Sequence, residues 1–175
     1  MAEAAPTVSR DALLQDGTDR AFRDFLHQLL AFSARLEAVR SGFARRLGLP
    51  GAAYPTLIGL SHLKRQMPEV GVKVLAEHLH VSPPSVTAEV NRLVQLRLVT
   101  KRNHPTDGRR VLLALTAKGE ALLRQLQPVQ APVNDALFGA LAPADFRRFG
   151  ELLPRMVADG DAALVLLQTM RESER

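Results

Sequence analysis

Basic side chains gather around one short turn in the middle of the chain. Lys101 and Arg102 precede a turn-rich segment, residues 103–109, which contains an Asp-Gly pair, and Arg109 and Arg110 close it. Runs of branched residues on both sides predict a β-hairpin with a basic tip. Ammonium and guanidinium groups suit phosphates, and a guanidinium also suits a narrow minor groove. These residue types favour a nucleic acid as the partner of the hairpin.

A second set of polar residues lies just upstream, on a segment with helical periodicity. Val86, Val90 and Leu93 recur at the spacing of one buried helix face. Hydroxyl and amide groups on the other face suit phosphate or base-edge contacts, and Asn91 can read adenine if it reaches a groove. The alternative is that Asn91 and Arg92 are merely solvated. The outward positions are Pro84, Ser85, Thr87, Ala88, Asn91 and Arg92.

The elements that position these residues are predicted to form a helix-turn-helix. Residues 72–79 carry a first apolar helical face, and Ser82 has the side chain that the N-cap of a second helix needs. Pro83 suits the first position of that helix and forces residue 82 out of the helical region, so the first helix must stop there. Two short helices followed at once by a basic hairpin predict a winged helix, whose second helix suits a major groove and whose hairpin suits the backbone or a minor groove.

Residues 72–116 resemble the DNA-binding core of the MarR family of bacterial transcription regulators. The most specific combination is an Asp-x-Arg wing, a strand and then Leu-Thr-x-x-Gly. Around this core the resemblance extends over roughly residues 18–170. Matching positions are Leu75-Ala76-Glu77 with Leu79, Val86-Thr87 with Arg92-Leu93, Leu98-Val99, Asp107-x-Arg109, Leu115-Thr116 and Gly119.

The resemblance also implies roles for the wing residues. Arg109 is expected to enter a minor groove, with Asp107 bracing it by a salt bridge, although Asp107 also suits a plain turn. Phosphate contacts are expected of Lys101, Arg102 and Arg110, with Ser82, Pro84, Ser85, Thr87, Asn91 and Arg92 completing the interface. One departure is Ala88, where the family often carries Arg, so the base preference of relatives does not carry over.

The remaining sequence predicts a mainly α-helical protein, a winged helix-turn-helix with a small β-hairpin wing and N- and C-terminal dimerisation helices. Residues 18–48 form an amphipathic pattern too wide for one small winged helix to cover, so part of it is expected to face a partner chain. Pro128 and Pro132 are expected to kink or break the helix that Thr116 caps. The last helix is expected to bury a side formed by Phe146, Phe149, Leu152, Leu153, Met156 and Val157. The predicted domains are a flexible N-terminal arm (1–17), a dimerisation region (18–54 and 117–175) and a winged helix-turn-helix DNA-binding domain (55–116).

The composition narrows the class of protein further. The net charge of the 175-residue chain is +5, and residues 72–116 hold seven Lys or Arg against three acids, so most of the excess lies on the segment proposed to contact DNA. The absence of cysteine excludes thiol redox sensing, disulfides and thiolate metal sites. No apolar run approaches the ~18 residues of a membrane span, and the N-terminus does not resemble a secretory signal. We therefore expect a cytoplasmic protein without membrane contact.

Histidine and tyrosine residues raise the question of ligand and metal sites. His78 and His80 lie about 200° apart on a helix and cannot form a joint site alone, so no metal or other cofactor is predicted. His104, at the wing tip, is expected to meet solvent or phosphate. In MarR relatives, small ligands bind between the dimerisation helices and the DNA-binding lobe, which here implies Tyr54, His62 and Arg46, although His62 equally suits a structural role.

The predicted function is a homodimeric, sequence-specific DNA-binding transcription regulator, most simply a repressor. Its two recognition helices would enter successive major grooves about 34 Å apart on a roughly palindromic operator, and a small aromatic or anionic ligand would release it. The alternatives are a winged-helix protein-interaction module without specific DNA binding, or a regulator without a ligand. No catalytic residues are predicted, because the chain has no phosphate-cradling glycine loop, nucleophile elbow or suggestive carboxylate pair.

Overall fold

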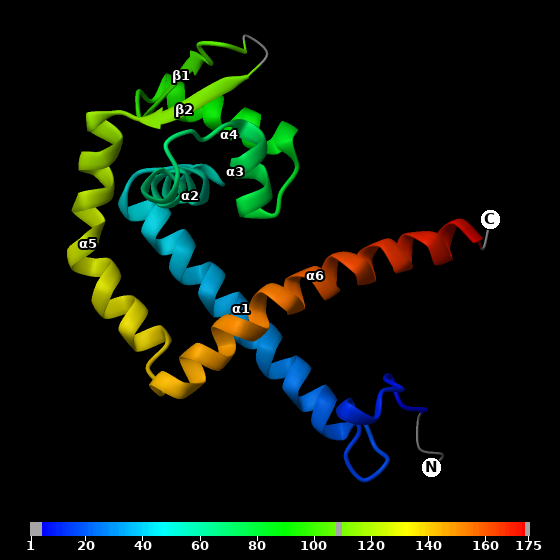
Figure 1. Ribbon diagram of the computed structural model, residues 1–175. Helices are drawn as coiled ribbons and strands as arrows, with labels where there is room; N and C mark the ends of the chain where they lie inside the picture. The colour runs from blue at the N-terminus through cyan, green and yellow to red at the C-terminus, as the bar shows by residue number, and fades with distance from the viewer. Residues whose placement is uncertain (1–4, 108–109, 174–175) are drawn as a thin grey trace. The chain divides into compact units, whose positions relative to one another are not determined.

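The computed structural model describes residues 5–107 and 110–173 of the chain (Figure 1). It confirms the predicted mainly α fold with a β-hairpin. The chain divides into two compact units, Met1–Ala131 and Pro132–Arg175. Among the described residues, no helix is both long and apolar enough to cross a membrane. The elements are a 3-10 turn Asp11–Leu13, α1 Arg20–Arg46, α2 Ala53–Gln66, α3 Val72–Leu79, α4 Pro83–Gln95, β1 Val99–Asn103, β2 Val111–Leu115, α5 Ala117–Leu137 and α6 Pro143–Ser173.

The predicted helix-turn-helix is confirmed as α3 and α4. His80 ends α3 in the left-handed conformation, with φ 52° and ψ 42°. Ser82 is the N-cap of α4, and its Oγ accepts a hydrogen bond from the backbone N–H of Ser85. Pro83 occupies the first helical position, where a missing N–H costs nothing. Local sequence chemistry therefore fixes the joint between the two helices.

The wing is a two-stranded antiparallel sheet, and a short segment of the α2–α3 linker pairs with its second strand. β1 and β2 pair with Val99 opposite Leu115 at one end and Asn103 opposite Val111 at the other. On the other side of β2, the N–H of Leu113 donates to the carbonyl of Val70 at 2.8 Å, and residue 71 forms a β-bridge with residue 112. The linker between α2 and α3 thus fastens the base of the wing to the helices.

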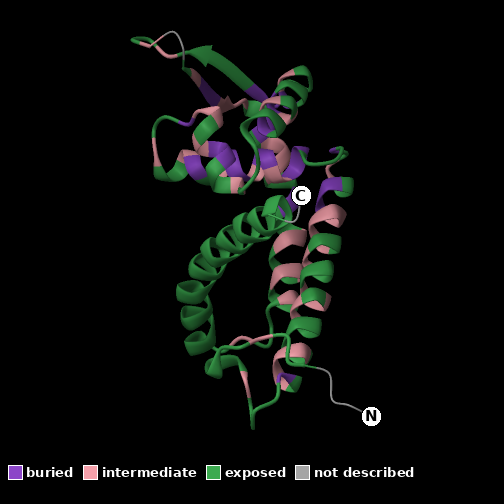
Figure 2. Ribbon diagram, turned by 90° about the vertical axis from the view of Figure 1, so that its right-hand side faces the viewer, coloured by how far each residue is buried: buried purple, intermediate pink, exposed green. Residues whose placement is uncertain are grey.

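Apolar side chains of α2, α3, α4 and the wing form one core. Leu57, Leu60, Leu75, Val90 and Leu93 are fully buried. Figure 2 shows the buried residues concentrated on the helices next to the small sheet. Each fully buried leucine contributes roughly 1.5–3 kcal/mol relative to an exposed one, so this core holds α4 firmly in place.

The Leu-Thr-x-x-Gly motif has a physical cause in the joint between the wing and α5. Thr116 donates through its N–H to the carbonyl of Leu98 (3.0 Å) and through its hydroxyl to the carbonyl of Arg97 (2.7 Å). Its Oγ1 also accepts from the N–H of Gly119 at 3.0 Å, which confirms Thr116 as a helix cap. A Cβ at Gly119 would lie only 2.3 Å from the Leu98 carbonyl oxygen, so only glycine fits this approach.

A kink or a break was expected near Pro128 and Pro132, and the break is wrong, because α5 runs without interruption to Leu137. The two prolines lie four residues apart, so the N–H that Pro132 lacks is the one that would bond the carbonyl of Pro128. The lost bonds therefore fall along one side of the helix, and the other rows of hydrogen bonds continue past them. α6 likewise continues through Pro154.

The described residues of α6 show that its expected buried side is not buried within the single chain. None of these residues is buried, and Phe146 and Phe149 are 67% and 44% exposed. An apolar surface of this extent is typical of a helix that packs against another surface.

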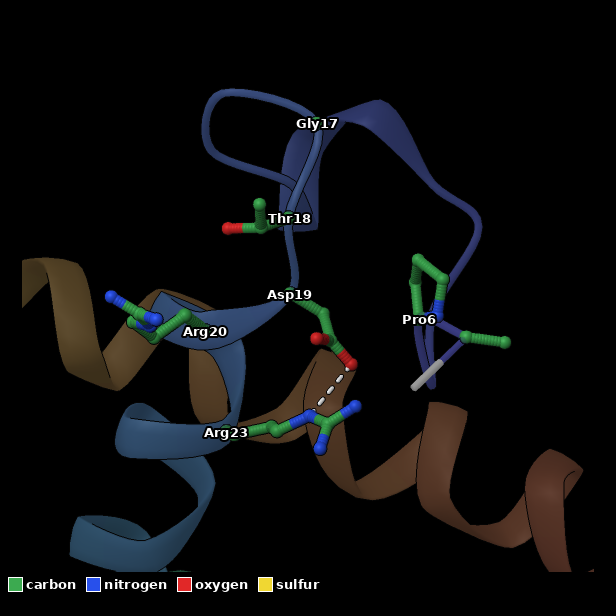
Figure 3. A pocket seen from close by; sticks show the side chains of 7 residues that line it. Pro6, Gly17, Thr18, Asp19, Arg20 and Arg23 are labelled. Atoms are coloured by element: carbon green, nitrogen blue, oxygen red, sulfur yellow. Dashed lines mark hydrogen bonds and ion pairs between the residues drawn. The ribbon is translucent and has the colours of Figure 1, made fainter. Parts of the chain in front are cut away.

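The described part of the N-terminal arm is anchored to the start of α1. The Asp19 carboxylate accepts hydrogen bonds from the N–H and the hydroxyl of Thr7, both at 2.6 Å, and from Arg23 Nε at 2.9 Å. These bonds, those from Thr7 foremost, hold the pKa of Asp19 well below its usual value. Figure 3 shows a shallow hollow beside this anchor, which Pro6, Gly17 and Arg20 also line.

Candidate nucleic-acid interface

The outward face of α4 presents the polar groups that the periodicity predicted. Pro84, Ser85 and Ala88 are exposed. The hydroxyls of Ser82 and Ser85 lie 2.8 Å apart, and that of Thr87, which is half-buried, donates to the carbonyl of Pro83 at 2.9 Å. The Thr87 oxygen keeps lone pairs for a further donor, whereas its hydrogen is already used within the helix.

Arg92, at the edge of this face, extends toward the loop between α1 and α2. It is exposed, and a Cβ at Gly51 would lie 3.7 Å from its Nη1. Its guanidinium therefore lies close to the loop backbone, to one side of the α4 surface.

Asn91 and Lys101 connect the recognition helix to the wing. The Lys101 ammonium donates a hydrogen bond to Asn91 Oδ1, and both residues are exposed. An ammonium has donors only, so it must face the amide oxygen and leave the amide NH₂ pointing away. The structure thus brings one predicted residue of α4 and one of β1 into a single surface and fixes the orientation of the amide.

The remaining wing residues surround the turn. Arg102 is exposed, and Arg110 is 55% exposed with Nη2 3.6 Å from Oε2 of Glu69. Asp107 is half-buried, and its N–H donates to His104 Nδ1 at 3.2 Å. Arg109 lies outside the described residues, so the predicted Asp107–Arg109 salt bridge stays a prediction.

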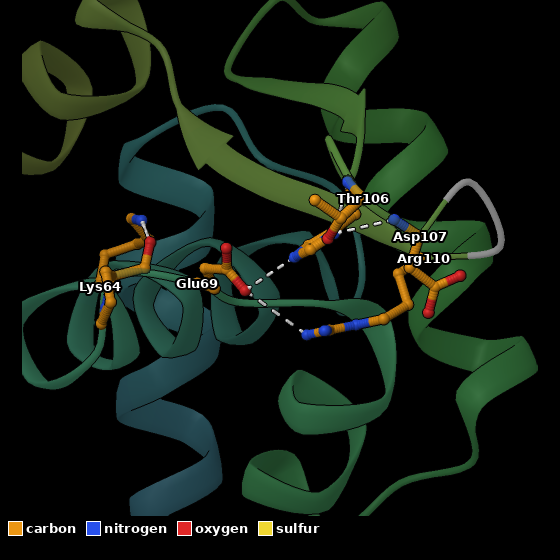
Figure 4. Close-up of polar contacts among 7 residues, drawn as sticks. Lys64, Glu69, Thr106, Asp107 and Arg110 are labelled. Carbon is orange, nitrogen blue, oxygen red and sulfur yellow. Dashed lines mark hydrogen bonds and ion pairs between the residues drawn. The ribbon is translucent and has the colours of Figure 1, made fainter.

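His104 does not meet solvent at the wing tip as expected. Only 11% of its side chain is exposed, because Nε2 lies 3.2 Å from Glu69 Oε2 and Nδ1 accepts from the wing backbone (Figure 4). Sequence analysis missed Glu69, which lies 35 residues from His104 in the α2–α3 linker. The sequence alone does not place the Glu69 carboxylate beside the basic wing, because that proximity follows from the pairing of the linker with β2.

Comparison with known proteins agrees with this architecture. A family model described as MarR family matches residues 47–110, from the end of α1 through the wing turn. A protein of Thauera aromatica, described as a transcriptional regulatory protein for the hcr operon, is 30% identical over 107 residues, which are 57% of this chain and 64% of that protein. The chain therefore spans less than two thirds of this relative's length.

Solved structures give the same result for the fold. BpsR of Bordetella bronchiseptica, whose DNA binding is regulated by 6-hydroxynicotinic acid, superimposes with a TM-score of 0.62 at 23% identity, over 86% of this chain and 98% of BpsR. The regulator PcaV of Streptomyces coelicolor, solved with its natural ligand, gives 0.57 at 26% identity, over 73% and 89%. The chain thus resembles the MarR family, most specifically over residues 47–110.

The three residues predicted to bind a ligand lie in different settings. Tyr54 is buried, with its ring edge-on to Phe43 and the Arg40 guanidinium 5.7 Å above it, and burial raises its pKa. Arg46 is exposed at the end of α1. His62 lines a hollow of about 690 Å³ between α2 and α5.

The histidines of α2 and α3 lie together without forming a recognisable metal site. The rings of His62 and His78 stack at 5.3 Å, and His62 also hydrogen-bonds Gln66. Burial and the neighbouring His62 and His80 lower the pKa of His78. Within residues 5–107 and 110–173, no three His, Asp or Glu side chains gather so as to hold a metal ion.

Proposed function

We propose that this chain is a sequence-specific DNA-binding regulator of transcription. The observation that carries the proposal is the joining of α4 to the wing through Asn91 and Lys101, which makes one continuous polar and basic surface. The charge of residues 72–116, seven Lys or Arg against three acids, supplies the phosphate attraction that such a surface needs. The recognition helix would enter a major groove and the wing would contact the adjacent backbone.

The regulator would act as a homodimer. The apolar face of α6 and exposed residues of α1, such as Phe25 at 53% and Leu30 at 58%, are surfaces that a second copy would cover. A two-fold dimer presents its two recognition helices symmetrically, which favours a palindromic operator with half-sites about one DNA turn apart.

A small aromatic acid would release the repressor from its operator. The hollow between α2 and α5 is lined by four groups able to carry positive charge, His62, Lys64, Arg65 and Arg124, and by a single acid, Glu120. This balance suits an anionic ligand. BpsR, whose DNA binding responds to an aromatic carboxylic acid, has the same fold. Such a ligand would act through its difference in affinity for the DNA-bound and free states.

The Asn91–Lys101 contact refines the base preference expected from the sequence. With one lone pair of its oxygen taken by Lys101, the Asn91 amide keeps its oxygen turned toward the lysine and its two N–H donors turned outward. Adenine needs a donor and an acceptor together, whereas guanine presents two acceptors, O6 and N7, in the major groove. We therefore propose that Asn91 favours guanine over adenine as long as Lys101 holds it.

The decisive experiment is a selection from random duplexes, followed by fluorescence anisotropy across a salt series. The wild type is expected to select a palindrome and to lose affinity steeply with salt, by a slope of about 0.9 per phosphate contact. Lys101→Met should lower the slope by about one and shift the selected base toward adenine, because it frees the Asn91 oxygen. Arg10→Met, which removes the same charge from the N-terminal arm, should change neither.

The alternative is a winged helix that binds a protein partner. In that case no palindrome emerges from the selection, and whatever duplex binding remains is indifferent to sequence. That outcome would reject the DNA-binding proposal.

A further inference from the structure

We propose that Glu69 and His104 are positioning residues that hold the wing tip in its DNA-contacting place. With Arg110 they form a cluster, here called the wing clasp, between the α2–α3 linker and the turn of the hairpin (Figure 4). The proposal, which rests on the DNA-binding function proposed above, assigns residues that touch no DNA themselves but decide where the wing lies.

The hairpin needs such support because its own pairing ends below the tip. A two-stranded sheet is marginally stable in water. Linker residues 70 and 71 reinforce β2 at Leu113 and Leu112, and β1 is exposed at every position after Val99. Beyond the last paired residues, Asn103 and Val111, other contacts must hold the turn.

His104 supplies the contacts within the turn. Its Nδ1 accepts from the N–H of Thr106 at 3.3 Å and of Asp107 at 3.2 Å, and it lies 3.2 Å from the Thr106 hydroxyl. The N–H of His104 donates to the carbonyl of Arg110 at 2.9 Å. Because Nδ1 accepts these bonds, the ring hydrogen lies on Nε2, the nitrogen that faces Glu69. One imidazole thus organises the turn on one side and reaches the linker on the other.

Glu69 supplies the contact to the body of the molecule. Its Oε2 lies 3.2 Å from His104 Nε2 and 3.6 Å from Arg110 Nη2. The linker that carries it is itself fixed, because Lys64 donates to the carbonyl of Pro68 and Val70 is fully buried. The clasp therefore connects a rigid base to the turn of the hairpin.

Because Glu69 is negatively charged, the direction in which its substitution changes DNA affinity tests the proposal. An acid beside a phosphate-binding wing repels DNA, so a Glu69 with no positioning role would weaken binding, and Glu69→Gln would tighten it. If Glu69 holds the wing, the same substitution replaces its charge-assisted contacts with His104 and Arg110 by weaker neutral ones, so it loosens the tip and weakens binding. Glu77 of α3 is the matched control, because it is an exposed acid of the same unit whose ion-pair partner is its helical neighbour Lys73.

The experiment compares wild type, Glu69→Gln and Glu77→Gln on the selected duplex by anisotropy across a salt series and by hydroxyl-radical footprinting. At about 0.1 M salt, loss of one phosphate contact lowers affinity about eightfold and reduces the salt slope by about one. We expect this loss, with a weaker footprint where the wing lies, for Glu69→Gln only. Equal or tighter binding of Glu69→Gln with an unchanged footprint would overturn the clasp.

Two histidine variants separate the two sides of the ring. His104→Asn keeps an acceptor near Nδ1 but does not reach Glu69, whereas His104→Gln reaches toward Glu69 but leaves the turn amides without an acceptor. Both should weaken the wing footprint and leave that of α4 in place. Unchanged wing footprints in both variants, with the melting temperature also unchanged, would show that the ring does not position the tip.

Amide hydrogen exchange of the free protein makes the clasp testable without DNA. Glu69→Gln should speed exchange at Thr106 and Asp107, and Glu77→Gln should not. If wild type selects no duplex, the DNA-binding function fails, while the exchange rates still show whether the clasp holds the turn. Wild-type exchange rates in Glu69→Gln would reject the clasp itself.

Discussion

The proposed DNA-reading unit, residues 53–115, and the last helix α6 differ in how their apolar faces are covered. Both carry amphipathic helical patterns, yet the reading unit buries leucines and valines such as Leu57, Leu75 and Val90 within the chain, and α6 buries none of its described residues. The reading unit also links its polar groups across elements, as at Asn91 with Lys101 and Glu69 with His104. A periodic apolar face thus shows that a helix packs against something, but not whether that surface belongs to its own chain.

The largest effect is expected from a charge in the apolar face of α6. Phe149→Glu places an acid in the face that a second copy is proposed to cover. Burying an unpaired charge twice in a symmetric dimer should weaken association by about 3 kcal/mol or more, roughly a hundredfold. Sedimentation equilibrium over a concentration series would measure the shift.

Ala158→Glu is the matched control for Phe149→Glu. Position 158 lies nine residues beyond 149, on the opposite side of the helix, so the same charge there stays in water. Dimers of equal strength in both variants would place the association surface elsewhere and remove the contrast between the two regions.

A pair of glycine substitutions tests the same contrast at the level of packing. Gly119→Ala in α5 forces a Cβ to within 2.3 Å of the Leu98 carbonyl oxygen, whereas a Cβ at Gly150 in α6 meets nothing within 4 Å. We expect Gly119→Ala to lower the free energy of unfolding by about 2–3 kcal/mol, because backbone must move. Gly150→Ala should raise it by up to about 1 kcal/mol through helix propensity. Urea unfolding would measure both, and effects of the same sign would contradict the comparison.

Local chemistry made the reading unit predictable from the sequence. Ser82 and Pro83 fix the start of α4, and the Asp-Gly turn between two branched runs predicts the hairpin, because each signal acts over a few residues. The two prolines of α5 misled because their effect depends on where the lost hydrogen bonds lie. Pro132 lacks the N–H that would bond the carbonyl of Pro128, so the losses fall on one side of the helix. The resemblance to the MarR family, drawn from the wing motif, is confirmed.

The side-chain contacts of the candidate site were not predictable in the same way. Asn91 with Lys101 and Glu69 with His104 join residues 10 and 35 positions apart, on elements whose pairing is set by the core. No local pattern specifies such contacts. His104 was therefore predicted to meet solvent or phosphate, although the structure places it in contact with Glu69 and with the backbone of the turn.

The smallest expected effect concerns backbone strain, which the two regions also distribute differently. Among the described residues, the non-glycine residues with positive φ are Asp16, His80 and Arg97, so the reading unit holds two and α6 none. His80 adopts the left-handed conformation that glycine tolerates without steric cost. His80→Gly should therefore raise the free energy of unfolding by a few tenths to about 1 kcal/mol, since the relief of strain exceeds the added entropy of the unfolded chain.

Ala88→Gly, on the exposed face of α4, should lower the free energy of unfolding by about 1 kcal/mol, because there the backbone is right-handed. If His80→Gly is as destabilising as Ala88→Gly in urea unfolding, the joint between α3 and α4 is held by its side chain, and the tight turn of the reading unit carries no strain for the core to offset.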